Sequence, residues 1–237
     1  MWSFFKKSSA VPALPYRVDF HSHLLPGLDD GSRSIEDTEM LLSEFNNLGV
    51  KRIITTPHIM HDTYRNSKDT ILPALERVKA SLTLPITIDA AAEYYLDEEL
   101  IKKVECEEPL LTFGDKMLLF ETNYLTEPFQ LKDFIFKATT QGYKLVMAHP
   151  ERYQYMSLRK AEELRDRGVL FQVNLLSFIG FYMKPVQVMA QKLVEQKWVD
   201  GLGSDCHNLI QVRSLHDVFK NRHFKLAMEL PILNHSL

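Results

Sequence analysis

The sequence predicts a single α/β domain in which parallel strands alternate with helices. Its 237 residues match the length at which α/β barrels commonly form one domain. From Arg17 almost to the end of the chain, short segments rich in β-branched and apolar residues alternate with amphipathic stretches, as in βαβ units. No internal repeat or linker composition interrupts this alternation. We therefore expect one domain over residues 16–237, preceded by a short extension over residues 1–15.

Seven short segments are predicted as strands. In chain order they cover residues 17–20, 51–55, 86–91, 116–120, 144–148, 169–173 and 198–202. The stretches between them are long enough to hold a helix each, as crossover connections between parallel strands require.

The residues that flank the amphipathic stretches support their assignment as helices. Ser34 is a suitable N-cap for a helix over residues 35–48, and Gly49 suits the left-handed position that follows a helix. Within this stretch Leu41 and Phe45 share one face. Further helices are predicted over residues 128–141, 157–167 and 185–196.

Composition and charge exclude several classes of protein. With 45% hydrophobic and 25% charged residues the chain is globular rather than disordered or collagen-like. A net charge of −3 gives no bulk attraction for nucleic acid or for an anionic membrane surface. Two cysteines are too few for a disulfide framework, and no apolar run approaches the roughly 20 residues that span a bilayer. We expect a cytoplasmic protein without nucleic-acid binding or membrane insertion.

Residue types that bind metal ions recur where the predicted strands end. In order along the chain they are His21, His23, His58, Glu93, Glu121, His149, Asp205 and His207. In a βα barrel the carboxyl ends of the strands meet at one rim, so these side chains would converge in one cup. Taken singly, each would more simply be a hydrogen-bonded core residue.

The chemistry of this set favours a site with more than one metal ion. Imidazole and carboxylate groups suit Zn, Mn or Fe, and no cluster of cysteines indicates a thiolate site. Side chains two residues apart on a strand point to the same side, so His21 and His23 form a chelating pair, and Asp205 and His207 repeat that spacing. The eight candidates exceed the three or four protein ligands that one catalytic ion needs. Two or three divalent ions are therefore expected.

The same residues carry a resemblance to a known family. The motifs are Asp19-Phe-His-Ser-His23, Leu25-Pro-Gly-Leu-Asp-Asp-Gly31, Thr56-Pro-His58, Ala92-Glu93-Tyr94-Tyr95, Ala148-His-Pro-Glu-Arg-Tyr153 and Gly203-Ser-Asp-Cys-His-Asn208. They resemble the PHP superfamily of polymerase and histidinol phosphatase domains. Within it they are similar to the bacterial manganese-dependent protein-tyrosine phosphatases of capsule and exopolysaccharide loci.

This resemblance implies a distorted seven-stranded (β/α)7 barrel with a trinuclear centre, most often of Mn²⁺, and the eight residues above match the family's ligands. By this resemblance Asp30 corresponds to an acidic residue beside the metals, and Arg152 corresponds to an arginine that binds the substrate phosphate. Arg213 is the nearest candidate for a second family arginine, although it lies one residue later than the family pattern. Asp30 or His207 would supply a proton to the leaving group.

The implied activity is hydrolysis of phosphotyrosine by a metal-bound hydroxide. The implied substrate is a phosphotyrosine protein, namely the cytoplasmic tyrosine kinase of a polysaccharide export system. A PHP-type phosphatase of a small molecule, such as histidinol phosphate or a sugar phosphate, is the alternative, because its metal chemistry is the same.

Three other hypotheses fit the sequence less well. A cysteine phosphatase needs Cys-x5-Arg, whereas six residues separate Cys206 from Arg213. A metal-dependent amidohydrolase usually has a carbamylated lysine late in a strand, whereas Lys116 and Lys144 begin theirs. A scaffolding module without activity would have lost ligands.

Some neighbouring residues have ordinary structural explanations. Arg152 could pair with Glu151 rather than with a phosphate. Asn174 follows the sixth strand, and it is left out of the site because its amide could serve the backbone of its own loop. Packing is the expected role of the tyrosines near the motifs, such as Tyr124 and Tyr153.

Overall fold

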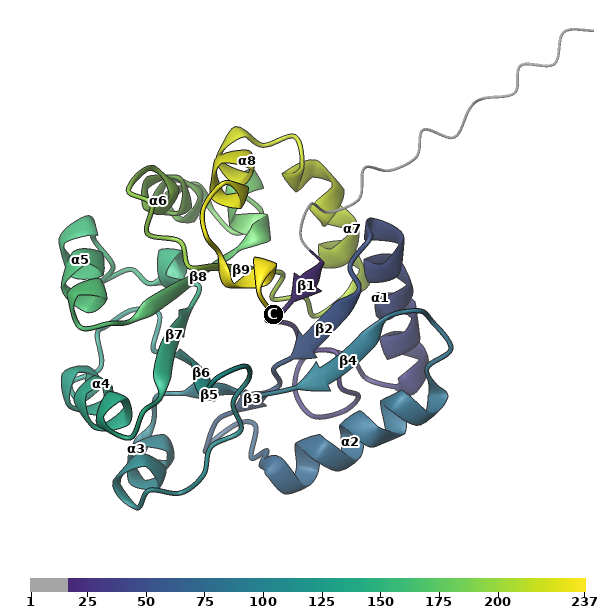
Figure 1. The fold of residues 1–237 in the computed structure, drawn as a ribbon, viewed down its shortest axis with the longest axis horizontal. Coiled ribbons are helices and arrows are strands. Elements are labelled where there is room, and N and C mark those ends of the chain that lie inside the picture. The colour runs from purple at the N-terminus through teal and green to yellow at the C-terminus, as the bar shows by residue number, and fades with distance from the viewer. Residues whose placement is uncertain (1–16) are drawn as a thin grey trace, which may run out of the picture.

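The computed structural model describes residues 17–237, so the predicted extension over residues 1–15 lies outside the described part of the chain. Figure 1 shows the strands arranged around the middle of the molecule, with the helices outside them. The strands are β1 (Val18–Asp19), β2 (Arg52–Thr55), β3 (His58–Ile59), β4 (Thr87–Ala90), β5 (Glu93–Tyr95), β6 (Met117–Glu121), β7 (Lys144–Ala148), β8 (Leu170–Asn174) and β9 (Gly201–Gly203). The helices are α1 (Ile35–Leu48), α2 (Lys68–Ser81), α3 (Glu98–Glu105), α4 (Leu131–Thr140), α5 (Leu158–Asp166), α6 (Lys184–Glu195), α7 (Leu209–Val218) and α8 (Arg222–Met228).

The α/β class and the parallel pairing are confirmed, whereas a closed seven-stranded barrel is not found among residues 17–237. All the pairs of named strands are parallel, and they form two sheets with the orders β1-β2-β4 and β3-β5-β6-β7-β8-β9. The second and third predicted strands are found as β2 and β4, and each is followed, after a break at residues 56–57 or 91–92, by a short strand that was not predicted, β3 or β5. Pro57 contributes to the first break because it has no N–H for the ladder.

Side chains and one isolated bridge replace a regular ladder between β1 and β9. The Asn234 amide donates to Val18 O at 2.9 Å and to Leu202 O at 2.7 Å, so it links the two strands. At Gly201 a Cβ atom would lie 2.4 Å from the Phe20 ring, so only glycine lets that ring fit. Beyond the strands a parallel bridge joins Ser22 to Cys206.

The predicted helices are found, with ends shifted by no more than three residues. Ser34 caps α1 by accepting from Asp37 N at 3.2 Å, and Gly49 adopts φ +95° directly after the helix. Four further helices, α2, α3, α7 and α8, have no counterpart among the predicted ranges. In α2, Pro73 lies inside the helix and conceals it in the sequence, because proline normally marks a helix boundary.

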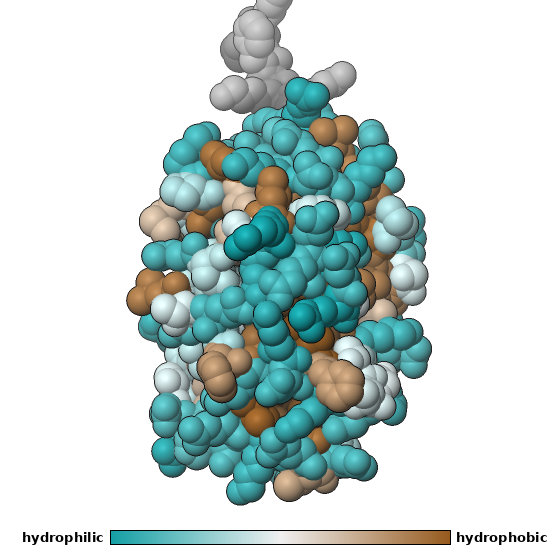
Figure 2. Space-filling view, turned by 90° about the vertical axis from the view of Figure 1, so that its left-hand side faces the viewer, coloured by the Kyte–Doolittle hydropathy of each residue, from teal (hydrophilic) through white to brown (hydrophobic). Residues whose placement is uncertain are grey.

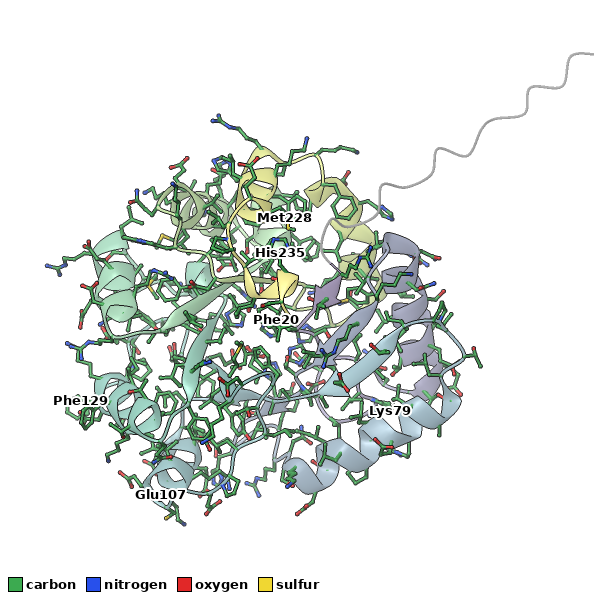
Figure 3. All side chains as sticks on the ribbon, viewed as in Figure 1. Phe20, Lys79, Glu107, Phe129, Met228 and His235 are labelled. Atoms are coloured by element: carbon green, nitrogen blue, oxygen red, sulfur yellow. The ribbon has the colours of Figure 1, made fainter. Side chains whose placement is uncertain are left out.

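Two separate hydrophobic clusters support the strands. The larger lies between strands and helices and includes Leu42, Phe45, Phe134 and Phe171. The smaller comprises Val18, Phe20, Ile54, Ala91, Phe113, Leu119, Val146 and Ala148, all buried. Its members come mostly from strands or from the residues next to them, so it packs among the strands, with Phe20 near the middle of the molecule in Figure 3.

The outer surface is mainly hydrophilic. Figure 2 shows that the face over the left-hand helices of Figure 1 carries apolar side chains as separate spots in a polar surface. Among the described residues no helix combines the length and the hydropathy needed to cross a membrane.

We expect Phe20→Ala to lower the free energy of unfolding by about 3–5 kcal/mol, because it empties the smaller cluster. Phe20 is fully buried and stacks on Phe113 with ring centroids 5.2 Å apart. The control is Phe129→Ala, since Phe129 is 95% exposed, and a change within about 0.5 kcal/mol is expected there. Urea unfolding of both variants measures the difference. Equal midpoints would contradict this account of the core.

Candidate metal centre

The eight residues predicted as metal ligands lie together at the carboxyl ends of the strands. His21 and His23 follow β1, His149 follows β7, and Asp205 and His207 follow β9. The remaining three lie within strands: His58 begins β3, Glu93 begins β5, and Glu121 ends β6. Six of the eight side chains are buried, whereas His58 and His207 are partly exposed. Segments from both ends of the sequence thus build one polar cluster.

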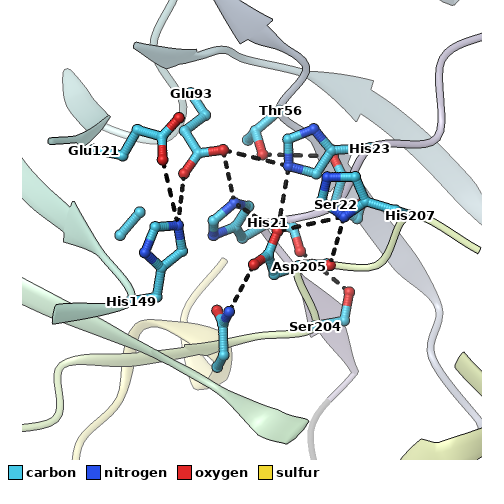
Figure 4. A network of polar contacts seen from close by, with 12 residues as sticks. His21, Ser22, His23, Thr56, Glu93, Glu121, His149, Ser204, Asp205 and His207 are labelled. Atoms are coloured by element: carbon cyan, nitrogen blue, oxygen red, sulfur yellow. Dashed lines mark hydrogen bonds and ion pairs between the residues drawn. The ribbon is translucent and has the colours of Figure 1, made fainter. Parts of the chain in front are cut away.

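The Glu93 carboxylate lies at the centre of this cluster (Figure 4). Its Oε2 atom is 3.2 Å from His21 Nε2, 3.3 Å from His23 Nε2 and 3.1 Å from His58 Nδ1. Its Oε1 atom is 3.0 Å from His149 Nε2. One carboxylate therefore faces four imidazole rings.

These atoms are close together without being satisfied by hydrogen bonds. His21 Nε2, His23 Nε2, His58 Nδ1 and Glu93 Oε2 have no hydrogen-bond partner among residues 17–237, although all four atoms are buried. Buried polar atoms normally have partners. Ligands about 2.0–2.2 Å from a common ion lie roughly 3 Å from one another, which is the spacing seen here. The donor set fits a divalent cation.

The donor atoms divide into several overlapping groups. Four groups have donor atoms within 4.8 Å of one another: His23, Asp30, His58 and His207; His21, Glu93 and His149; His21, His23 and Asp205; and His58, Glu93 and Glu121. Glu93, His21, His23 and His58 each belong to two groups. Shared ligands between adjacent groups are what a centre with more than one ion requires.

The cluster strongly favours positive charge. Burial acts against the charged form of His21, but the carboxylates of Glu93 and Asp205 outweigh it and raise the pKa of this imidazole to about 9. Burial also disfavours the charged form of Glu93, but the surrounding histidines hold the pKa of this carboxyl well below its usual range. A site that binds protons this firmly also attracts a divalent cation, which competes with them for the same atoms.

Neighbouring polar groups fix the orientation of the histidine rings. Gln172 Oε1 lies 2.6 Å from His21 Nδ1, and Asp29 Oδ2 lies 2.7 Å from His23 Nδ1. In both rings the nitrogen that faces the cluster is therefore Nε2, as expected for a metal-binding imidazole whose other nitrogen is hydrogen-bonded. Asp29 thus orients His23 from outside the donor groups.

Two of the predicted ligands have strained backbones. His149 has φ +35° and Asp205 has φ +49°, a region that residues other than glycine rarely adopt. Such strain concentrates at functional sites, where the surrounding structure holds it in place.

Arg152 lies beside the cluster and pairs with Asp205 rather than with Glu151. Its Nη1 donates to Asp205 Oδ2 at 2.9 Å, and its Cζ atom lies over the rings of Tyr124 and Tyr182, 4.9 and 4.5 Å from their centroids. Glu151 is buried and accepts hydrogen bonds from Asn174 N and Ser177 Oγ.

Asn174 and Tyr182 belong to the site but were not predicted. The Asn174 amide donates to Asp205 Oδ2 at 2.7 Å and to the Tyr182 hydroxyl at 3.2 Å. Asn174 ends β8, so the rule that selected the other residues at strand ends also applied to it. Tyr182 lies between a short 3-10 helix and α6, where no sequence pattern indicated a role.

A cavity of about 560 Å³ opens above the cluster. Its walls include Tyr64, Tyr124, Arg152 and Tyr182, together with His58, Glu121, His149, Asp205 and His207. Asp30 lies at its margin, half-exposed, with Oδ1 3.4 Å from His207 Nε2.

Arg213, the predicted second phosphate-binding arginine, does not line the cavity. Its Nε donates to Glu44 Oε1 at 2.8 Å, and its side chain is 62% exposed. The structure therefore gives Arg213 a partner in α1 rather than a place beside the metal-type residues.

Cys206 lacks the surroundings of a nucleophile. Its side chain is buried and belongs to the larger hydrophobic cluster, whereas Asp205 and His207 belong to the polar cluster. Burial, followed by the nearby Asp19 carboxyl, raises the pKa of the thiol. A cysteine phosphatase would require the opposite shift and an exposed thiolate.

Comparison with known proteins gives consistent relatives. Tyrosine-protein phosphatase CpsB of Streptococcus pneumoniae is 27% identical over 202 residues, which cover 81% of this chain and 83% of that protein. Tyrosine-protein phosphatase YwqE of Bacillus subtilis is 25% identical over 205 residues, which cover 84% and 80%.

The fold also matches a solved structure from a study of YwqE from Bacillus subtilis and CpsB from Streptococcus pneumoniae, described as unique metal-dependent tyrosine phosphatases. The TM-score is 0.77 at 23% identity, over 92% of this chain and 90% of that one. The family model described as capsular polysaccharide synthesis, CpsB/CapC, matches residues 17–216. This chain therefore belongs to the CpsB/CapC family of capsular polysaccharide synthesis.

Proposed function

We propose that this protein is a metal-dependent protein-tyrosine phosphatase. The observation that carries the proposal is the arrangement around Glu93, whose Oε2 atom lies within 3.3 Å of three imidazole nitrogens and has no hydrogen bond. The names of the relatives, tyrosine-protein phosphatases, support the same reaction. They do not favour the alternative of a small-molecule phosphatase.

The eight residues of the cluster would hold two or three divalent ions. Mixed imidazole and carboxylate donors suit Mn²⁺, the ion expected from the resemblance, and also Fe or Zn. When bound, such ions lower the pKa of a water molecule and neutralise charge on phosphoryl oxygens. The surrounding residues keep the donor atoms aimed at the same space, through Gln172 on His21 and Asp29 on His23.

Arg152 is suited to bind the phosphate of the substrate. A guanidinium has five N–H donors, and the single hydrogen bond to Asp205 leaves the others for a ligand. Its contacts with the Tyr124 and Tyr182 rings restrict its movement. A guanidinium group held in place in this way can donate hydrogen bonds to two phosphoryl oxygens at once.

The cavity walls suit an aromatic leaving group. Tyr64, Tyr124 and Tyr182 all line the cavity, so a tyrosyl ring entering it meets aromatic surfaces. A tyrosyl oxygen has a pKa of about 10, so it leaves with less help from an acid than an alkyl oxygen does. Asp30 and His207, both partly exposed at the cavity, are the two candidates for that acid.

The proposed partner is a phosphotyrosine protein, namely the cytoplasmic tyrosine kinase of a polysaccharide export system. Family membership in capsular polysaccharide synthesis supports this choice, and with it a cytoplasmic location. Residues 16–237 would form the phosphatase domain, and residues 1–15 an extension of it.

Metal binding should stabilise the fold. Adding Mn²⁺ at about 100 times its Kd to chelator-stripped protein contributes about 2.7 kcal/mol, which raises the Tm by roughly 5–10 °C at this chain length. Glu93→Gln should lose most of this shift, because Glu93 belongs to two donor groups. Differential scanning calorimetry with and without Mn²⁺ tests this. An equal shift in both proteins would place the ions elsewhere.

Turnover should depend on the same donors. We expect stripped protein to lose hydrolysis of a phosphotyrosine peptide and Mn²⁺ to restore it, with less activity on phosphoserine and histidinol phosphate. His21→Ala should lower kcat/KM by at least about 100-fold. The matched control is His235→Ala, because His235 is exposed. Turnover that survives stripping would disprove the metal mechanism, and metal-restored turnover of small phosphates alone would favour the small-molecule alternative.

Arg152→Ala should lower kcat/KM for phosphotyrosine by about 10²–10³-fold, because it removes a donor to the phosphate. Arg159→Ala is the control, since Arg159 is exposed on α5. Arg213→Ala tests the remaining expectation from the sequence, and its pairing with Glu44 leads us to expect a much smaller effect. Steady-state kinetics of the three variants decides between these roles. Equal losses in Arg152→Ala and Arg159→Ala would refute phosphate binding by Arg152.

A further inference from the structure

A second hollow adjoins the metal cavity. It has a volume of about 350 Å³ and shares Asp30, His207 and Asn208 with that cavity. Its other lining residues come from α1, from α7 and from the segments before these helices: Gly31, Ser32, Arg33, Asp37, Met40, Leu41, Leu209 and Ile210. We name it the α1–α7 groove. A ligand that fills the cavity can continue into the groove without leaving the protein surface.

The walls of the α1–α7 groove carry exposed apolar side chains. Met40 is 46% exposed and Ile210 is 72% exposed. Isolated exposed apolar residues are ordinary, but apolar residues grouped along a hollow indicate a binding surface.

The distribution of exposed apolar residues over the described chain strengthens this point. Seven large apolar side chains are exposed among residues 17–237: Met40, Leu125, Phe129, Phe136, Phe181, Met183 and Ile210. Leu125, Phe181 and Met183 directly adjoin the cavity residues Tyr124 and Tyr182 in sequence. Two of the seven thus line the groove, three are sequence neighbours of cavity residues, and the other two lie in or next to α4.

Hydrogen bonds hold the groove in a defined shape. Asn208 caps α7 by accepting from Ile210 N and Gln211 N, both at 3.1 Å. The Gln211 side chain accepts from His207 N at 2.6 Å. The pair between Arg213 and Glu44 joins α7 to α1. The groove walls are therefore fixed to the residues that face the metal-type cluster.

The α1–α7 groove carries charged groups of both signs. Asp30 and Asp37 line it together with one cation, Arg33. The Asp30 carboxylate also lies 3.4 Å from His207 Nε2 and 3.7 Å from His58 Nε2. No single charge dominates the groove, so apolar contact decides which side chain it prefers.

We infer that the α1–α7 groove binds an apolar side chain of the polypeptide substrate, within three residues of its phosphotyrosine. This inference rests on the proposed function and adds sequence preference to it. The occupant is a polypeptide because only a chain can place a phosphate beside Arg152 and a second side chain beside Ile210. Three residues of extended chain span about 10 Å, enough to pass from one hollow to the hollow next to it.

The experiment measures kcat/KM for phosphotyrosine peptides in which Leu, Ser or Glu is placed singly at each position from −3 to +3, with p-nitrophenyl phosphate as a substrate too small to reach the groove. The enzymes are Mn²⁺-loaded wild type, Ile210→Ser, Met40→Ser and the control Phe136→Ser. Phe136 is 69% exposed, close to the 72% of Ile210, and lies on α4.

At one position we expect Leu to exceed both Ser and Glu by about 5- to 10-fold. Ile210→Ser and Met40→Ser should reduce this preference to less than about twofold. Phe136→Ser should keep it, and all four enzymes should hydrolyse p-nitrophenyl phosphate alike.

Two results would overturn the inference alone: equal rates for Leu and Ser at every position in wild type, or an unchanged preference in both groove variants. Either result leaves phosphotyrosine hydrolysis, and with it the proposed function, intact. Absence of metal-restored turnover of every phosphotyrosine peptide would overturn the proposed function and the inference together.

Discussion

The hydrogen bonds between the end of β1 and the segment that follows β9 determine whether the site exists. Asp205 N donates to His21 O at 2.8 Å, and His23 N donates to Cys206 O at 2.9 Å. These bonds align the segment of His21 and His23 with the segment of Asp205 and His207, although the two lie far apart in the sequence. Burial raises the pKa of Asp19 to about 6, and the Ser204 hydroxyl and N–H partly offset that cost by donating to its carboxylate. The cluster therefore depends on contact between two distant parts of the chain.

Asp205 connects the cation-binding part of the site to the phosphate-binding part. Its Oδ1 faces His21 and His23 at 3.6 and 3.4 Å, whereas its Oδ2 accepts from Arg152 and Asn174. A shift of this one carboxylate moves both the donors for metal ions and the arginine.

The sequence predicted which residues gather at the site better than it predicted how the strands pair. The positions of the cluster residues followed from a simple rule, that parallel strands bring their carboxyl ends together, and this rule needs no exact strand boundaries. The short strands β3 and β5 were not predicted, and neither was the irregular contact between β1 and β9 at Gly201. These features depend on local packing, such as that of the Phe20 ring, which no periodicity reveals. Tyr182 was missed for the same reason, because its contact with Arg152 arises only in three dimensions. Asn174 was missed although its position at the end of a strand pointed to the site.

The central position of Glu93 also limits how such a site can change over evolutionary time. Because one carboxylate faces four imidazoles, loss of any single partner leaves buried charge or an unmatched donor in an interior where both are costly. Substitutions within a group of this kind are not independent of one another. A lineage can therefore exchange these residues only through coordinated replacements, whereas exposed residues outside the site are free to change one at a time.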